Sequence, residues 1–273
     1  MLPFVKWAGG KRQLKKRLET EMPSQYHAYF EPFIGGAALL FYIQPDVPVY
    51  INDINPQLIH AYRTIRDNTE EFIQRIQSLD NVPCTKEWYY DMRQRYNHNV
   101  HMQIFNIETA VLFVYLNKHC FNGLYRVNGK GLFNVPWNHK EKVASIETEN
   151  IRWIAAFLQR ANVLIENRDF SYIEDICEVG DFVYFDSPYD ILSKTSSFVD
   201  YTKESFKEKD HRRLAALFQR LTERGVYCLA TNHNTPLIRA LYQDFHIEEV
   251  RVQRAINADA SKRVGKEIII KNY

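Results

Sequence analysis

Seven short apolar segments constrain the fold of this chain more than any other feature. They lie at residues 28–33, 49–52, 162–165, 181–185, 226–230, 246–252 and 267–271. Near-continuous runs of branched and aromatic residues are typical of strands that are buried on both faces of a sheet. Amphipathic helical patterns, such as the one at residues 209–224, separate several of these segments. The alternation predicts an α/β fold with a doubly wound, seven-stranded sheet.

Residues from about 58 to 155 interrupt this alternation and contain mainly helical patterns. Helices are expected at residues 56–77, 86–96, 107–118 and 151–160, with a loop-rich run at 121–131. We interpret residues 58–155 as a helical domain that is inserted between the second and third strands. Residues 1–57 and 156–273 would then form one domain around the sheet, and 273 residues suffice for both domains.

Positive charge is concentrated in parts of the chain, although the formal net charge is only +2. Residues 1–18 carry six cations and no acid, and further basic clusters lie at 116–145 and after residue 250. Residues 166–190 hold eight acids and one arginine. Such a distribution suits a protein that binds a polyanion with one face and a ligand in a pocket. Solvated helix faces explain the charge equally well.

Membrane and metal functions are not expected from this sequence. The longest unbroken apolar run, residues 110–116, is far shorter than the ~20 residues that span a bilayer. The N-terminus lacks the basic-then-apolar pattern of a signal peptide, so we expect a cytoplasmic protein. None of the four cysteines forms a Cys-x-x-Cys pair, and His98 and His101 have no third ligand nearby. We therefore expect no metal and no membrane partner.

Glycines and an acid follow the first two predicted strands. Gly35 and Gly36 come after the first strand, and Asp53 ends the second. Glycines let the backbone approach a ligand closely, and an acid in that place typically accepts hydrogen bonds from ribose hydroxyls. The pair favours a cofactor of the adenosine type.

The fourth predicted strand ends in Asp186, Ser187, Pro188 and Tyr189. An aromatic ring beside a fixed carboxylate can stack on a flat heterocycle while the carboxylate accepts a hydrogen bond from its amino group. The alternative is an acidic turn with a packed tyrosine.

Taken together, these segments resemble the Dam-type DNA adenine methyltransferases of class alpha, from Phe4 to Tyr273. The motifs that carry the resemblance are residues 6–11, 30–37, 52–55, 121–126, 133–136, 186–189 and 267–273. The resemblance implies a seven-stranded S-adenosylmethionine-dependent methyltransferase fold with an inserted helical DNA-recognition domain. It also implies methyl transfer to the N6 amine of adenine in double-stranded DNA, commonly within GATC. The adenine would be flipped out of the helix and methylated by direct in-line transfer.

The resemblance also implies roles for individual residues. Around S-adenosylmethionine it places Trp7, Lys11, Phe33, Gly35, Gly36, Asp53, Asp169 and Asp186. Around the flipped adenine it places Asp186, Ser187, Pro188 and Tyr189. Its DNA contacts are Phe121, Asn122, Leu124, Arg126, Lys130 and Pro136, of which Arg126 matches the residue that contacts a guanine. Lys130, Lys140 and the stretch 254–263 are expected to contact phosphates, and a restriction endonuclease is expected only as a genetic partner.

One departure from the family pattern leaves alternatives open. The family usually has Asp-Pro-Pro-Tyr, and Ser187 stands here in place of the first proline. Serine keeps the backbone carbonyl but loses the φ restriction, so a weakened or silent DNA-binding homologue is the main alternative. A cytosine methyltransferase would need a nucleophile such as Cys84 after Pro83, away from any predicted strand end. An enzyme acting on RNA or on another amine is disfavoured by the Arg126 loop.

Overall fold

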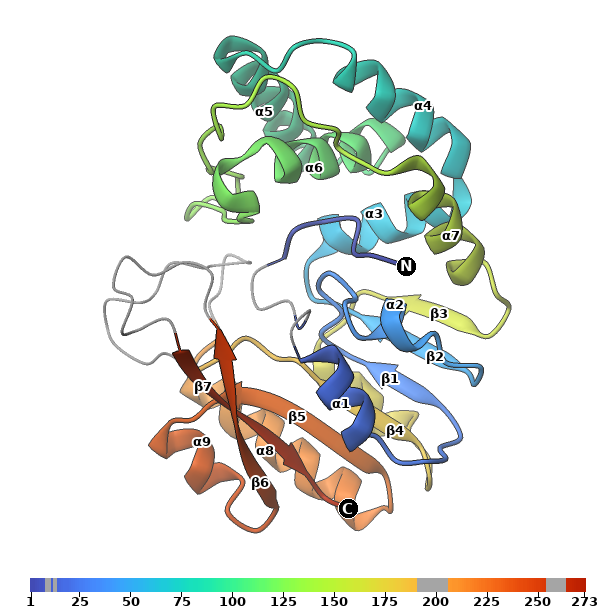
Figure 1. Cartoon of the computed structure of the whole chain (residues 1–273), viewed down its shortest axis with the longest axis vertical. Helices are drawn as coiled ribbons and strands as arrows, with labels where there is room; N and C mark the ends of the chain where they lie inside the picture. Colours follow the sequence, from blue (N-terminus) through green and yellow to red (C-terminus); the bar gives the residue numbers. More distant parts are fainter. Residues whose placement is uncertain (8–10, 12–13, 191–205, 254–263) are drawn as a thin grey trace.

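The fold is that of a computed structural model that describes residues 1–7, 11, 14–190, 206–253 and 264–273. One seven-stranded sheet forms its lower half, with the strand order β3-β2-β1-β4-β5-β7-β6 (Figure 1). Neighbouring strands from β3 to β5 are parallel, and β7 is antiparallel to both β5 and β6. The strands are β1 Tyr29–Glu31, β2 Val49–Asn52, β3 Val163–Glu166, β4 Phe182–Phe185, β5 Tyr227–His233, β6 His246–Gln253 and β7 Val264–Lys271. The predicted α/β fold with a seven-stranded sheet is confirmed.

The central strand β4 shows why its sequence is almost continuously apolar. Phe182 and Tyr184 belong to one hydrophobic cluster, whereas Val183 and Phe185 belong to another on the opposite face. Successive side chains of a strand point to opposite faces, so all four residues are buried. Polar side chains therefore have room only beyond the ends of this strand.

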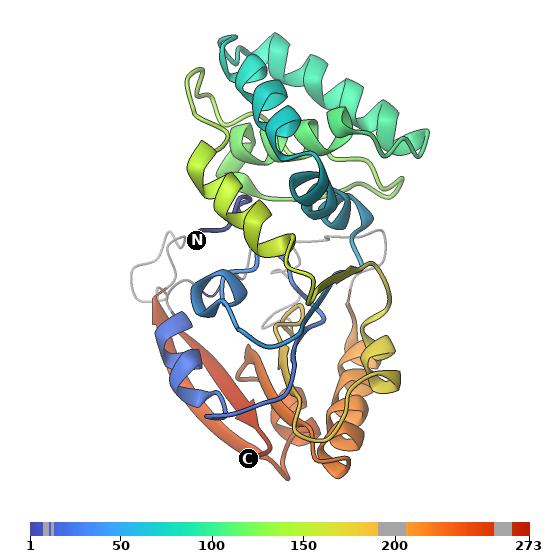
Figure 2. The ribbon, with the colours of Figure 1, turned by 90° about the vertical axis from the view of Figure 1, so that its right-hand side faces the viewer.

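Helices cover both faces of the sheet. Figure 2 shows α1 (Lys15–Glu21) and α8 (Glu208–Glu223) on opposite sides of it. Leu217 and Phe218 of α8 pack on the face of Val183, together with Ile238 of α9 (Pro236–Leu241). Leu18 of α1 belongs to the cluster on the other face, together with residues of α2 (Leu40–Ile43). The two covered faces account for the doubly wound pattern of the sequence.

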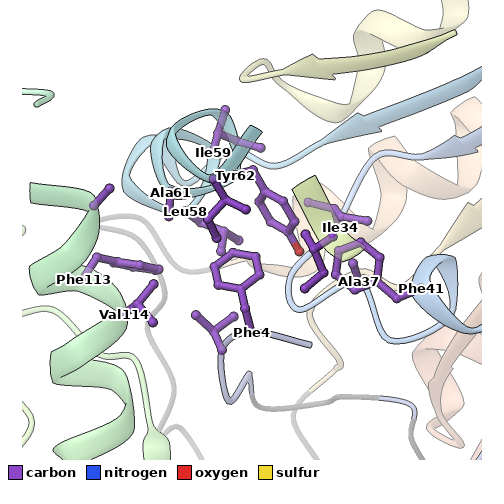
Figure 3. Close-up of a cluster of buried hydrophobic side chains, with 14 of the residues drawn as sticks. Phe4, Ile34, Ala37, Phe41, Leu58, Ile59, Ala61, Tyr62, Phe113 and Val114 are labelled. Atoms are coloured by element: carbon purple, nitrogen blue, oxygen red, sulfur yellow. The ribbon is translucent and has the colours of Figure 1, made fainter. Parts of the chain in front are cut away.

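A second layer of helices lies above the sheet edge. Its helices are α3 Pro56–Asp67, α4 Thr69–Asp80, α5 Lys86–His101, α6 Ile107–His119 and α7 Thr148–Leu158. α6 is buried along most of its length because α3, α4 and α5 all contact it. Figure 3 shows Phe113 and Val114 of α6 close to Phe4 and Tyr62, and the Phe4 and Tyr62 rings meet edge to face at 4.8 Å. The helical layer and one face of the sheet thus share a continuous hydrophobic core.

Two expectations about element boundaries need correction. The helix predicted at 56–77 is two helices, because Asn68 leaves helical geometry at φ −132° and ψ 41° between α3 and α4. The strand predicted at 28–33 ends at Glu31, since Pro32 has no N–H to continue the ladder. The predicted domain boundaries at residues 57/58 and 155/156 lie within α3 and α7, and the division into two domains stays a prediction.

Two buried asparagines bind the N-terminal segment to the helical layer. Asn117 of α6 accepts a hydrogen bond from the Lys6 N–H (2.7 Å) and donates to the Lys6 carbonyl (2.9 Å). It also donates to the Gly123 carbonyl at 3.2 Å. Asn150 of α7 makes the same pair of bonds with the backbone of Leu2, at 2.8 and 2.9 Å. Each side-chain amide thereby satisfies the backbone N–H and carbonyl of a residue that is not part of a strand.

We expect Asn117→Leu to lower the free energy of unfolding by about 2–4 kcal/mol. Each buried backbone group left without a partner costs roughly 1–3 kcal/mol, and leucine satisfies none of the three groups. Urea unfolding followed by circular dichroism measures the change. Asn81→Leu, at an exposed position, serves as the control with an expected change within about 0.5 kcal/mol. Equal stability of the two variants would contradict this account.

Candidate active site

The carboxyl ends of β1, β2 and β4 meet where the strand order reverses. The chain passes from β1 to β2 and β3 on one side and from β4 to β5 on the other. Open α/β sheets bind ligands at such a switch point. Gly35 and Gly36 follow β1, Asp53 follows β2 and Asp186 follows β4, so these predicted residues lie at one edge of the sheet.

Asp186 forms a partly shielded ion pair with Lys11. The Lys11 Nζ lies 2.6 Å from the Asp186 Oδ1, and the lysine side chain is only 4% exposed. The Thr231 hydroxyl of β5 donates to the same oxygen at 3.1 Å. Burial raises the pKa of Asp186, whereas the Lys11 ammonium and the Thr231 hydroxyl oppose this rise. The charged form of the Asp186 carboxyl group is therefore stabilised by Lys11 and Thr231.

Tyr189 lies beside the same ion pair. The Lys11 Nζ is 4.4 Å from the centroid of the Tyr189 ring, and His233 meets the ring edge to face at 4.7 Å. The Tyr189 hydroxyl donates to Glu267 Oε2 of β7 at 2.8 Å. Lys11 thus touches both the predicted acid and the predicted aromatic residue. Ser187 between them is buried, and Pro188 is half-buried.

Asp53 is bound to the glycine turn after β1. Its Oδ2 accepts a hydrogen bond from the Gly35 N–H at 3.1 Å, and its Oδ1 accepts from the Asn55 N–H at 2.9 Å. Burial raises the pKa of Asp53 to about 6, against these two bonds and a third from Ile54. Gly35 has φ +47°, and a Cβ there would lie 2.7 Å from Trp7 Cδ1. Only glycine therefore fits this turn.

Trp7 connects the glycine turn to the loop that follows α6. Its ring stacks on Tyr125 with centroids 5.4 Å apart, and it also contacts Phe113. Tyr62 of α3 donates to the Gly35 carbonyl at 2.9 Å from the other side. Residues 8–10, which complete the motif of Trp7 and Lys11, lie outside the described residues. Trp7 therefore packs between the glycine turn and the loop after α6 at this edge of the sheet.

Phe33 and Asp169 lie near this edge as well. The Phe33 ring packs on Phe170 at 5.3 Å, and Asp169 precedes Phe170 in the turn after β3. The Asp169 carboxylate accepts hydrogen bonds from Ser171 and from Arg213, the latter at 2.8 Å. Burial acts to raise the pKa of Asp169, but these hydrogen bonds outweigh it and hold the pKa below its ordinary value.

Asp53, the glycine turn and an aromatic surface fit the needs of an adenosine-type cofactor.

The loop after α6 carries the residues predicted to contact DNA. Phe121 and Asn122 are exposed in the short 3-10 turn Phe121–Gly123, where Asn122 has φ +55°. The Phe121 N–H donates to the Pro136 carbonyl at 2.8 Å, so these distant positions lie side by side. Pro136 is exposed and Leu124 is half-buried. The structure thereby gathers these four residues on one loop region.

Arg126 lies in a hairpin next to this turn. Val127 and Phe133 form a bridge across the hairpin, and the Arg126 Nε donates to Asn134 Oδ1 at 2.8 Å. Lys130 is exposed at the hairpin tip, and Lys140 is exposed further along the chain. The stretch 254–263, which was expected to contact phosphates, lies outside the described residues.

Several residues of this site were not found from the sequence. Thr231 and Glu267 contact the Asp186 and Tyr189 side chains, and His233 packs on Tyr189. For Thr231 and His233, the available signal in the sequence is their position after the apolar run at residues 226–230. Lys11 was assigned to the cofactor alone, although it binds the Asp186 carboxylate. Cys84 is buried in the loop between α4 and α5, away from this sheet edge.

Two negative findings concern the described part of the chain. There, no three His, Cys, Asp or Glu side chains come together as a possible metal site. Among the same residues, no helix has both the length and the apolar character that crossing a membrane requires.

Comparisons with known proteins show which sequences this chain is similar to. The model of the family described as "D12 class N6 adenine-specific DNA methyltransferase" matches residues 7–256. The type II methyltransferase M1.LlaDCHI of Lactococcus lactis subsp. cremoris is 40% identical, over 99% of this chain and 95% of the relative. The type II methyltransferase M.MjaIII of Methanocaldococcus jannaschii is 35% identical, over 99% of both chains. The DNA adenine methylase of Escherichia coli is 34% identical, over 99% of this chain and 94% of the relative.

We expect the stability of the protein to depend on pH through Asp53. Its pKa rises from 3.8 to about 6 on folding, so the neutral form is favoured in the folded state. The contribution of Asp53 to the free energy of unfolding is therefore complete below about pH 4 and is lost as the pH rises through about 6. Relative to Asp53→Asn, the wild type should lose up to about 3 kcal/mol between pH 4 and pH 7. Urea unfolding of both proteins across this range measures the difference.

Asp244→Asn, at an exposed position, is the matched control and should follow the wild-type profile. Parallel profiles of the wild type and Asp53→Asn would show that this carboxyl does not titrate as described.

Proposed function

This chain belongs to the D12 class of N6 adenine-specific DNA methyltransferases, and from that premise we propose that it transfers the methyl group of S-adenosylmethionine to adenine within double-stranded GATC. Membership of the class makes the chain an adenine-specific DNA methyltransferase. The observation that carries the finer proposal is the contact of Lys11 with both Asp186 and Tyr189 at the sheet edge. A carboxylate beside an aromatic face is the arrangement that an exocyclic amine on a flat ring requires.

Four residues would hold the cofactor. Asp53 would accept hydrogen bonds from the ribose hydroxyls of the cofactor, and the Gly35 turn would let the backbone approach the cofactor closely. Phe33 and Asp169 would line the adenine ring of the cofactor. When bound, S-adenosylmethionine supplies an electrophilic methyl group on a sulfonium. The neighbouring positions of Asp53 and Asp186 at one sheet edge support a shared site for cofactor and base.

Asp186 would orient the amine that receives the methyl group. Within the described part of the chain, the Lys11 and Thr231 side chains both bind Oδ1, so Oδ2 can accept a hydrogen from the adenine amine. The Ser187 carbonyl would accept the second hydrogen. These two acceptors favour a pyramidal nitrogen and stabilise the positive charge that develops on it.

Tyr189 would stack on the target base. An adenine amine inside a duplex is out of reach, so the base must leave the helix. Stacking on an aromatic side chain contributes roughly 1–3 kcal/mol per base. The hydrogen bond from the Tyr189 hydroxyl to Glu267 fixes the ring before the base arrives. The rate enhancement then comes mainly from positioning and fixed charges.

Residues 58–155 would form the DNA-recognition domain, and residues 1–57 and 156–273 the catalytic domain. Arg126 would read a guanine, and Leu124 and Pro136 would meet the thymine methyl group. Phe121 and Asn122, both exposed, would insert near the flipped base, while Lys130 and Lys140 would contact phosphates. We also propose a restriction endonuclease as a genetic partner, since two relatives carry the name type II methyltransferase.

We expect Asp186→Ala to abolish methyl transfer and Asp186→Asn to reduce it at least about 100-fold, the usual effect of losing a group that stabilises developing charge. Binding of GATC duplex in a gel-shift assay should change little, because Asp186 would contact only the flipped base, whereas phosphate contacts supply most of the affinity. Incorporation of labelled methyl groups into the duplex measures the activity.

Asp175→Asn, an exposed acid on the turn after β3, is the control and should retain full activity. A thermal melt identifies any variant that is unfolded because Lys11 has lost its partner. Normal incorporation by Asp186→Ala would refute the assignment, and an inactive wild type would support a homologue silenced at Ser187.

We expect Arg126→Ala to lower discrimination at the guanine position by about 5- to 100-fold, because a bidentate arginine–guanine contact contributes roughly 1–3 kcal/mol. The kcat/KM ratio between GATC and a duplex with that guanine replaced measures the discrimination. Lys130→Ala is the matched control: it should weaken binding equally for both duplexes, as loss of a phosphate contact does. An unchanged ratio in Arg126→Ala would show that another residue reads the guanine.

A further inference from the structure

The Arg126 guanidinium is held in place by the side chain of Asn134. The Arg126 Nε donates to Asn134 Oδ1 at 2.8 Å, while the Asn134 N–H donates to the Arg126 carbonyl at 3.1 Å. Both residues are half-buried. Within the described residues, no carboxylate pairs with Arg126, so its partner is a neutral amide. This amide fixes one nitrogen of the guanidinium.

The residues on either side of Asn134 are fixed to α5. Asn97 donates to the Phe133 carbonyl at 3.0 Å and accepts from the Phe133 N–H at 2.9 Å. On the other side of Asn134, the Val135 carbonyl accepts hydrogen bonds from the Tyr89 hydroxyl at 2.8 Å and from Arg93 at 3.2 Å. Asn134 therefore lies between two anchored residues.

Burial of the flanking side chains reinforces this frame. Phe133 is 3% exposed and Val135 is 2% exposed. The Phe133 ring contacts Tyr96 of α5 edge to face at 6.2 Å and Tyr125 at 5.7 Å. Because side chains alternate along an extended segment, the Asn134 amide is turned away from this core and toward Arg126.

The geometry points to Asn134 as a positioning residue for base recognition, which rests on the proposed role of Arg126. Guanine presents two acceptors, O6 and N7, in the major groove. The Asn134 contact occupies Nε and leaves the two terminal nitrogens of the guanidinium to face these acceptors end-on. A side chain already held in its binding conformation loses less rotamer freedom on contact. Asn134 thereby strengthens discrimination by Arg126.

Steady-state kinetics of Asn134→Ala and Asn134→Asp test this inference. The measured quantity is the kcat/KM ratio between GATC and the duplex with the read guanine replaced. Asn134→Ala should lower this ratio by roughly five- to tenfold, a part of the full effect of a bidentate contact. Asn134→Asp should also lower the ratio, because a carboxylate pairs with the guanidinium in a bidentate manner and occupies a terminal nitrogen as well as Nε.

A double variant shows whether Asn134 acts through Arg126. In the Arg126→Ala background, adding Asn134→Ala should leave the ratio unchanged, because residues that act through one contact are not additive. Thermal melts of all variants separate a loss of folding from a loss of discrimination. Asn97→Ala should lower the ratio in the same direction as Asn134→Ala, since it frees the anchored segment.

The outcomes separate this inference from the proposed function. If Arg126→Ala lowers the ratio but Asn134→Ala raises KM equally for every duplex, Asn134 contacts the DNA backbone and the inference is overturned. A further loss from Asn134→Ala in the Arg126→Ala background overturns it as well. If Arg126→Ala itself leaves the ratio unchanged, the proposed role of Arg126 fails, and this inference fails with it.

Discussion

Burial of the central strand on both faces is the constraint from which the active-site geometry follows. Phe182 to Phe185 have no room for a polar side chain, so the first position at which β4 can carry one is Asp186. β2 differs, because the buried Asn52, which donates to the Pro32 and Arg168 carbonyls, precedes Asp53. The reversal of strand order beside β1 then brings these two carboxyl groups to one edge of the sheet. In β4, the position of the carboxyl group thus follows from the burial of the strand on both faces.

The ion pair of Lys11 with Asp186 has two effects. A carboxylate removed from water is costly unless a charge or a hydrogen bond compensates it, and Lys11 supplies that charge. The pair also joins the N-terminal segment to the middle of the sheet. Since Trp7 packs on Tyr125 in the loop after α6, the same segment links the helical layer to the site. Positions that are far apart in the sequence thus form one connected unit.

The sheet and its polar edge could be predicted from the sequence because their signals are local. Apolar runs mark the strands, and the residues that follow each run mark the edge. The break at Asn68 could not be predicted, because helical periodicity continues through it into α4. The pairing of Lys11 with Asp186 leaves no local pattern either, and neither does the contact of Asn134 with Arg126, because both depend on tertiary structure.

The asparagine contacts of the N-terminal segment determine the order in which the chain can become native. Lys6 and its partner Asn117 are separated by 111 residues, and Leu2 and Asn150 by 148. Loops of this length must close before these bonds form, which slows folding. During synthesis, Lys6 must therefore wait for Asn117, and Leu2 for Asn150, before these bonds can form. The N-terminal segment therefore takes its native place only after α6 and α7, which carry these asparagines, have been made.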